Sequence, residues 1–97
     1  MLMITEQPNE NALTFKLAGA LAGEWATVLE RCWCDAINAS VASRFVVDLT
    51  EVTFVDETGK ELLSLMMRQG VEIIARDILM KSIVEEIVNE SSSAGTR

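Results

Sequence analysis

The chain has 97 residues, 49% of them hydrophobic, and a formal net charge of −7. This length suits one small domain, and the apolar share is enough to fill a core without disulfides. The negative charge argues against nucleic acid and anionic membrane surfaces as partners, because both require a basic footprint. Histidine is absent, which removes imidazole general-base chemistry, Ser-His-Asp triads and most zinc sites.

No apolar run reaches the length that spans a bilayer, and the N-terminal residues 1–5 lack the basic region of a signal peptide. A cytoplasmic protein without direct membrane insertion is therefore expected. Cys32 and Cys34 lie two positions apart on a predicted helix, so their side chains point to nearly opposite sides. The spacing favours one core thiol and one surface thiol over a disulfide or a redox site.

Two strands are predicted in the first part of the chain. Residues 2–5 form the first, and the segment 6–11 contains the only proline and two asparagines, which predicts a turn. Residues 13–17 alternate apolar and polar side chains, as in a strand with one wet face. Residues 19–23 are glycine, alanine and leucine and predict a loop, without the spacing of a nucleotide-binding fingerprint.

The clearest predicted helix covers residues 24–39. Seven of its residues form an apolar stripe at three- and four-residue spacing: Trp25, Val28, Leu29, Cys32, Trp33, Ala36 and Ile37. An aromatic stripe can bind a ligand, but this spacing is more typical of a helix face packed into a core. Residues 38–43 form a small polar connection to the next strand.

The central part of the chain predicts a strand, a helix and a second strand. Residues 45–49 are apolar and mostly β-branched, residues 62–67 are largely apolar at helical spacing, and residues 71–75 form the following strand. Gly70 stands where helices often end in a left-handed residue. This βαβ unit is expected to have a right-handed crossover.

A last helix is predicted from a cap at Asp77 to about Asn89. The polar segment 91–97 is expected to be a disordered tail, so that residues 1–90 form the single domain.

The segment 56–59, Asp-Glu-Thr-Gly, joins the central strand to its helix and gathers several polar groups. Thr58 and Glu61 match a capping box, in which the Thr58 hydroxyl would accept a backbone N–H, and Asp56 is a competing cap. Alternatively, Thr58 accepts a phosphoryl group. No cationic, imidazole or thiol side chain lies nearby to assist these carboxylates in catalysis. Their spacing also does not match a calcium-binding loop. No enzyme, metal or cofactor is therefore expected.

The stretch VVDLTEVTFVDETGKELLSLM, residues 46–66, resembles the core of a STAS domain, the module of anti-sigma-factor antagonists. The apolar-Asp pair at residues 55–56 and the hydroxyl-Gly pair at residues 58–59 match that pattern. Glu57 and Lys60 depart from it, since the family usually has a small or hydroxyl residue at the first position and an apolar one at the second. The resemblance covers about residues 10–88. It implies a bacterial, non-enzymatic signalling domain in transcription regulation, whose kinase partner phosphorylates Thr58.

The polar positions of the strands predict how the helices are arranged. Each of the later strands carries polar side chains on one face: Thr14 and Lys16, Asp48 and Thr50, and Glu72. A sheet covered on both sides tolerates few such positions. We therefore expect an α/β fold with a four-stranded mixed sheet and three helices on one face, as the STAS resemblance also implies.

The resemblance further implies that this chain is short at its C-terminus, because family members usually continue with another strand and helix. The sheet edge at residues 71–75 is then open to another chain, and a homodimer is one reasonable outcome.

The expected function is docking onto an anti-sigma factor that resembles a serine/threonine kinase. The expected partner-binding residues lie at the start of the central helix and along it: Asp56, Glu57, Thr58, Gly59, Lys60, Ser64 and Met67. Phosphorylation of Thr58 would break the cap, place new negative charge beside acidic neighbours and release the partner. Two alternatives are a STAS subunit of an ABC-type lipid transporter, which would bind the ATPase subunit without phosphorylation, and a homotypic building block of a stress-signalling assembly.

Overall fold

The computed structural model describes residues 1–39 and 44–95. Its elements follow in the order β1 (Leu2–Pro8), β2 (Ala12–Leu21), α1 (Glu24–Ala39), β3 (Arg44–Val55), α2 (Glu57–Arg68), β4 (Glu72–Ile74) and α3 (Ile78–Gly95). The strands form one sheet in the order β1-β2-β3-β4. The β1–β2 pair is antiparallel and the other two pairs are parallel, so the predicted four-stranded mixed sheet is confirmed.

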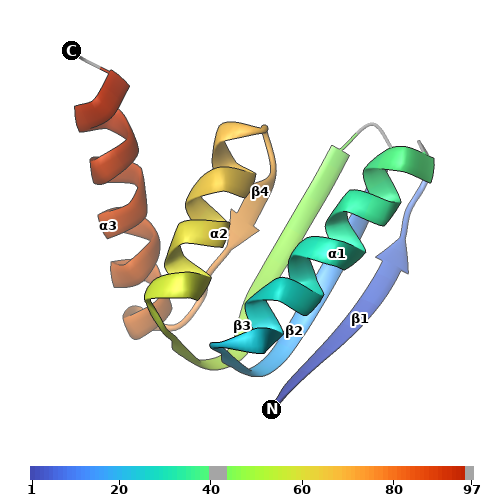
Figure 1. Cartoon of the computed structure of the whole chain (residues 1–97), viewed down its shortest axis with the longest axis horizontal. Coiled ribbons are helices and arrows are strands. Elements are labelled where there is room, and N and C mark those ends of the chain that lie inside the picture. The colour runs from blue at the N-terminus through green and yellow to red at the C-terminus, as the bar shows by residue number, and fades with distance from the viewer. Residues whose placement is uncertain (40–43, 96–97) are drawn as a thin grey trace.

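All three helices lie on one face of the sheet, as the sequence predicts (Figure 1). The helix-facing positions of β2 are Leu13, Phe15 and Leu17, and each is buried. Between them, Thr14 and Lys16 lie on the opposite face and remain partly exposed. This alternation explains the architecture, because only one face of the sheet has enough apolar surface to be covered.

Strands β2 and β3 are longer than the sequence predicts. β2 continues to Leu21, through residues expected to form a loop, and β3 continues to Val55. The two strands pair in parallel, with register shifts after Lys16 and after Gly19. At Gly19, φ is +106° and a Cβ atom would overlap the carbonyl oxygen of Met1, so only glycine fits this close approach of β1 and β2.

Helix α1 has the predicted bounds, but its buried stripe is rotated from the predicted one. Ala26, which was not in the predicted stripe, is buried, whereas Val28 and Ile37 are exposed. The predicted apolar stripe is wider than the helix surface that packs on the sheet. Val28 and Ile37, at the edges of that stripe, therefore lie outside the core. Cys32 is half-buried and packs against the core, Cys34 is exposed, and both are free thiols, so their side chains point to different sides of α1 as expected.

The end of α2 agrees with the sequence-based prediction, whereas the end of α3 does not. Gly70 follows α2 with a φ of +92°, as the prediction of a left-handed residue requires. Helix α3 continues past Asn89 to Gly95, into the segment 91–97 that was expected to be a disordered tail. Residues 96 and 97 lie outside the described residues. None of the described helices is long and apolar enough to cross a membrane.

Candidate functional site

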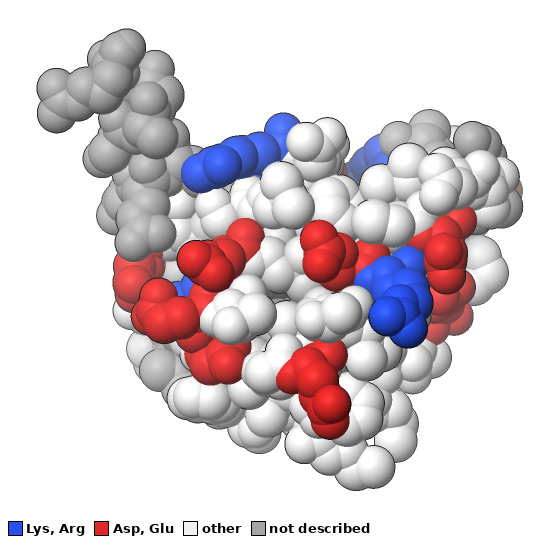
Figure 2. Space-filling view, in the orientation of Figure 1, with Lys and Arg blue, Asp and Glu red and all other residues white. Residues whose placement is uncertain are grey.

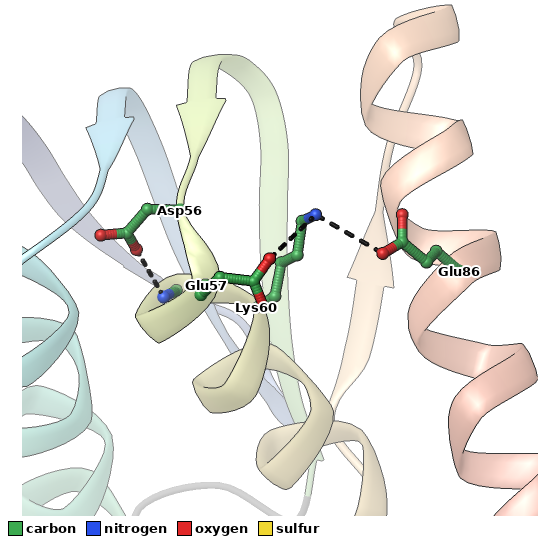
Figure 3. Close-up of polar contacts among 5 residues, drawn as sticks. Asp56, Glu57, Lys60 and Glu86 are labelled. Carbon is green, nitrogen blue, oxygen red and sulfur yellow. Dashed lines mark hydrogen bonds and ion pairs between the residues drawn. The ribbon is translucent and has the colours of Figure 1, made fainter.

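Asp56 holds the first turn of α2 in place. It is the N-cap residue, and its Oδ1 accepts a hydrogen bond of 2.8 Å from the backbone N–H of Gly59 (Figure 3). Its Oδ2 accepts a second bond of 2.9 Å from the N–H of Gly23, immediately before α1. One carboxylate therefore ties together the starts of two helices that are far apart in the sequence.

These two bonds also determine the charge of Asp56. The backbone N–H groups of Gly59 and Gly23 hold the pKa of the Asp56 carboxyl below its usual value, because each bond is stronger to the ionised form. Asp56 is therefore a carboxylate at neutral pH, and both of its oxygens have protein partners.

Gly59 lies on the inner side of the same turn. It is buried, and a Cβ atom built there would lie 2.5 Å from the carbonyl oxygen of Leu21 and 2.9 Å from Cγ1 of Val55. The sequence analysis placed Gly59 among the partner-binding residues. Its burial corrects this role: Gly59 lets α2 approach the sheet closely and does not present a contact surface.

Thr58 lies on the outer side of the turn and is exposed. The predicted Thr58–Glu61 capping box is not formed, because Asp56 is the N-cap and α2 already begins at Glu57. Thr58 instead lines a groove of about 220 Å³ between α1 and α2. On the α1 side the groove is lined by Thr27 and Glu30. The Thr58 hydroxyl group is thus in a position that another protein can reach.

Lys60, one of the expected partner-binding residues, is only partly accessible. Its side chain is 24% exposed, and its Nζ lies 3.8 Å from Glu57 and 3.5 Å from Glu86 of α3 (Figure 3). These ion pairs connect α2 to α3. The Lys60 charge is therefore already balanced by two carboxylates.

The exposed apolar residue of this surface is Leu65, which was not among the expected partner-binding residues. Met67 and Ser64 were expected to bind the partner, but both are half-buried, and Met67 packs against the core. Leu65 is 38% exposed. Leu65 follows Thr58 by seven residues and Glu61 by four, so all three lie on one helix face. This spacing was the sequence signal that could have identified Leu65 as part of the exposed surface.

Glu61 and Leu65 form a ridge between two grooves. Both residues line the α1–α2 groove and also a second groove of about 350 Å³ between α2 and α3. We refer to Thr58, Glu61 and Leu65 as the α2 ridge. Acidic side chains are spread over this face of the molecule, with basic side chains at its upper rim and among the acidic ones on the right (Figure 2). No group of three or more potential metal-binding side chains occurs in the described parts of the chain.

No protein-family model and no curated protein sequence matches this chain. Solved structures do match it. The anti-sigma factor antagonist SpoIIAA, in its unphosphorylated form, aligns with a TM-score of 0.68 and 14% identity. The alignment covers 86% of this chain and 82% of SpoIIAA.

Two further structures show the same arrangement. A protein of the DUF3478 family from Shewanella loihica, described as having a SpoIIAA-like fold, aligns at TM-score 0.57 and 21% identity over 81% of this chain and 70% of its own. The protein Mglu aligns at TM-score 0.60 and 19% identity over 75% of this chain, which corresponds to 19% of Mglu. This chain therefore has the SpoIIAA-like STAS fold, shared at low sequence identity.

Proposed function

We propose that this protein is a regulatory interaction domain of the anti-sigma-factor-antagonist type, which docks onto a kinase-like anti-sigma factor through the α2 ridge. The observation that carries the proposal is the exposed Thr58, on the first turn of α2 in a SpoIIAA-like fold. The residues that anchor this turn, Asp56 and Gly59, are separate from the exposed ones. The ridge can therefore meet a partner without any change of fold.

The ridge also indicates what the partner surface must supply. Leu65 offers an apolar anchor, and the exposed carboxylates of Glu61 and Glu30 lie beside it. An apolar side chain surrounded by charges is a typical centre for a small interface, with the charges determining orientation and association rate. The partner is expected to place an apolar pocket over Leu65 and arginine or lysine side chains opposite Glu61 and Glu30, while the phosphates of its bound nucleotide face the Thr58 hydroxyl.

Phosphorylation of Thr58 would weaken this fit, because the added phosphate would face the phosphates of the partner's bound nucleotide. A phosphate adds about two negative charges at neutral pH. It would stand beside Glu57, Glu61 and Glu30, while Lys60 is already paired with Glu57 and Glu86. Because Asp56 caps the helix, phosphorylation leaves the cap intact, and the switch acts through surface charge. The sequence interpretation, in which the phosphate breaks the cap, is replaced by this one.

Binding measurements test the docking surface. The probe is the kinase-like anti-sigma factor from the same genome, titrated calorimetrically with the wild type, Leu65→Ala and Met3→Ala. Removal of a buried apolar anchor typically costs about 1 kcal/mol or more, so Leu65→Ala is expected to weaken binding about tenfold. Met3 is 66% exposed in β1, and because its neighbour Leu2 faces the core, Met3 lies on the face of the sheet opposite to the helices and serves as the matched control. Equal losses in both variants would contradict the proposed surface.

Intact-mass measurement tests the switch. Incubation with the same partner and Mg-ATP is expected to add one phosphate to the wild type and none to Thr58→Ala. Thr58→Glu is expected to bind the nucleotide-bound partner more weakly than Thr58→Ala, because its carboxylate would face the phosphates of the partner's nucleotide. An unmodified wild type, in a reaction where a control substrate is phosphorylated, would remove the switch. Binding only to a transporter ATPase would replace the proposal with the transporter alternative.

A further inference from the structure

In the described part of the chain, all three helices lie on one face of the sheet and none covers the other (Figure 1). On β2, Leu17 and Leu21 are fully buried in the core, on the helix side. Because side chains alternate along a strand, Ala18 and Ala20 lie on the opposite face, where both are half-buried. We refer to this uncovered face as the open face. Its two small alanines leave a shallow trough along β2.

Beside this trough lies an exposed aromatic side chain. Phe54 of β3 pairs with Ala20, so it also lies on the open face. It is 54% exposed, whereas Phe15 is buried and Phe45 packs against the core. The open face thus carries a large apolar group next to a space that only small residues occupy. Two identical surfaces of this kind can fill each other's space when a two-fold axis relates them.

The charge of the open face favours a second copy of this chain as its occupant. The paired strands place two basic and three acidic side chains there: Lys16, Arg44, Asp48, Glu51 and Glu72. These charges nearly balance, whereas the whole chain has a net charge of −7. Two copies that met through a strongly acidic surface would repel each other. On the open face this repulsion is small.

Lys16 and Asp48 give the open face a complementary pair of charges. They are cross-strand neighbours on β2 and β3, and both are half-buried. The Oδ1 atom of Asp48 accepts two hydrogen bonds from Thr50, which leaves Oδ2 to a cation. The pair therefore repeats the relation of Ala20 to Phe54, in which a residue of β2 is complementary to its neighbour on β3.

We propose that two copies of this chain associate through their open faces. A two-fold axis that lies in the interface, parallel to the strands and midway between β2 and β3, places each β2 residue opposite the β3 neighbour of the other copy. Phe54 of each copy then fills the alanine trough of the other, and Lys16 of each copy meets Asp48 of the other. The helices point away from this interface, so both copies keep the α2 ridge accessible and the proposal does not depend on the docking function.

The size of the open face predicts a weak dimer. The four strands have seven, ten, twelve and three residues. At about 3.3 Å per residue and about 4.8 Å between strands, the face measures roughly 500 Å². Two faces together bury roughly 1,000 Å², the lower limit for a specific interface, so a dissociation constant on the order of 100 μM is expected. Such a dimer is dissociated at low micromolar concentrations and does not interfere with partner titrations performed there.

Sedimentation equilibrium of the full chain, up to millimolar concentration, tests the association. The average mass of the wild type is expected to rise from that of a monomer toward that of a dimer. Phe54→Ser is expected to weaken the dimer about thirtyfold, because each dimer loses the apolar contact twice. Ile37→Ser is the matched control, since Ile37 is a 44% exposed apolar residue of α1, on the helix side of the sheet. Its dissociation constant is expected to equal that of the wild type.

Two charge variants test the two-fold arrangement. Lys16→Glu and Asp48→Lys, each alone, are expected to weaken the dimer about tenfold, because like charges then meet twice in the interface. An equimolar mixture of the two is expected to restore dimer formation, because each variant supplies the charge that the other needs. Circular dichroism checks that Asp48→Lys folds, and Phe54→Ser and Lys16→Glu test the proposal without it.

The proposal is overturned by a wild type that stays monomeric at millimolar concentration, or by Phe54→Ser or Lys16→Glu forming the dimer as strongly as the wild type. It is also overturned if Ile37→Ser weakens the dimer as much as Phe54→Ser does. A mixture of the two folded charge variants that dimerises no better than either alone would contradict the two-fold arrangement.

Discussion

The two sides of the first turn of α2 have opposite physical character. On the inner side, Asp56 is bonded to two backbone N–H groups and Gly59 lies in close contact with β2. On the outer side, Glu57, Thr58 and Glu61 are exposed. The comparison shows that the residues holding this turn alternate along the chain with the residues a partner can reach. A modification on the outer side can therefore alter binding while the inner side keeps the helix in place.

The largest effect on stability is expected from Gly59→Ala. The new Cβ atom would lie 2.5 Å from the carbonyl oxygen of Leu21, which is backbone and cannot move aside easily. Overpacking of this kind costs about 3 kcal/mol, and the better helix propensity of alanine returns about 1 kcal/mol, so a net loss of about 2 kcal/mol is expected. Urea unfolding followed by circular dichroism measures it. An unchanged midpoint would mean that the inner side is not closely packed.

A smaller, pH-dependent effect is expected from Asp56→Asn. The folded-state pKa of Asp56 is lowered by the bonds from Gly59 and Gly23, so its contribution to stability is present above the unfolded pKa of about 3.9. That contribution is lost as the pH falls through the folded pKa. Asparagine can still cap the helix but does not titrate and offers one acceptor oxygen.

The melting temperature of Asp56→Asn is therefore expected to lie a few degrees below that of the wild type at pH 7. The gap should begin to narrow near the unfolded pKa of about 3.9 and close as the pH falls through the lower folded pKa, where the wild-type carboxyl becomes protonated in the folded state too. Asp56→Ala is the control, because it loses the cap at every pH and should remain below the wild type throughout. A gap that stays constant between pH 7 and pH 3 would show that the charge of Asp56 does not stabilise the turn.

The smallest effect on stability is expected from Thr58→Ala. Thr58 is exposed and is not the N-cap, so its loss should change the free energy of unfolding by no more than about 0.5 kcal/mol. If Thr58 were the capping residue, its loss would instead lower the free energy of unfolding by about 1 kcal/mol. The same urea experiment distinguishes the two values. A loss of the larger size would place Thr58 on the supporting side of the turn.

Much of the fold could be predicted from local patterns. The apolar periodicity of residues 24–39 gave the bounds of α1, and Gly70 marked the end of α2, because helix formation and helix ends depend on nearby residues. The ends of β2 and β3 were missed. Residues 19–21 are small and resemble a loop, and they extend β2 because the parallel partner β3 supplies their hydrogen bonds.

The sequence indicated the segment of the candidate site, but the exposure of its side chains depends on the fold. Thr58 was expected at an accessible helix start and is exposed there. The sequence alone could not distinguish Leu65 from Met67 as the exposed residue, since both belong to one broad apolar stripe. The rotation of α2 about its axis decides this, and the packing of Leu62, Leu63 and Met66 against the core determines that rotation.

Local chemistry in the chain was sufficient to specify a mixed sheet with one apolar face, three amphipathic helices and an acidic turn before the second helix. Both Thr58 and Asp56 were possible caps for that helix, and in the fold Asp56 caps it and also binds the N–H of Gly23, across 33 positions of the chain. The position of Phe54 beside Ala20 on the open face likewise depends on the pairing of β2 and β3. Periodicity and propensity act between neighbours in sequence, whereas hydrogen-bond partners and cavities arise from segments that meet only when the chain is folded.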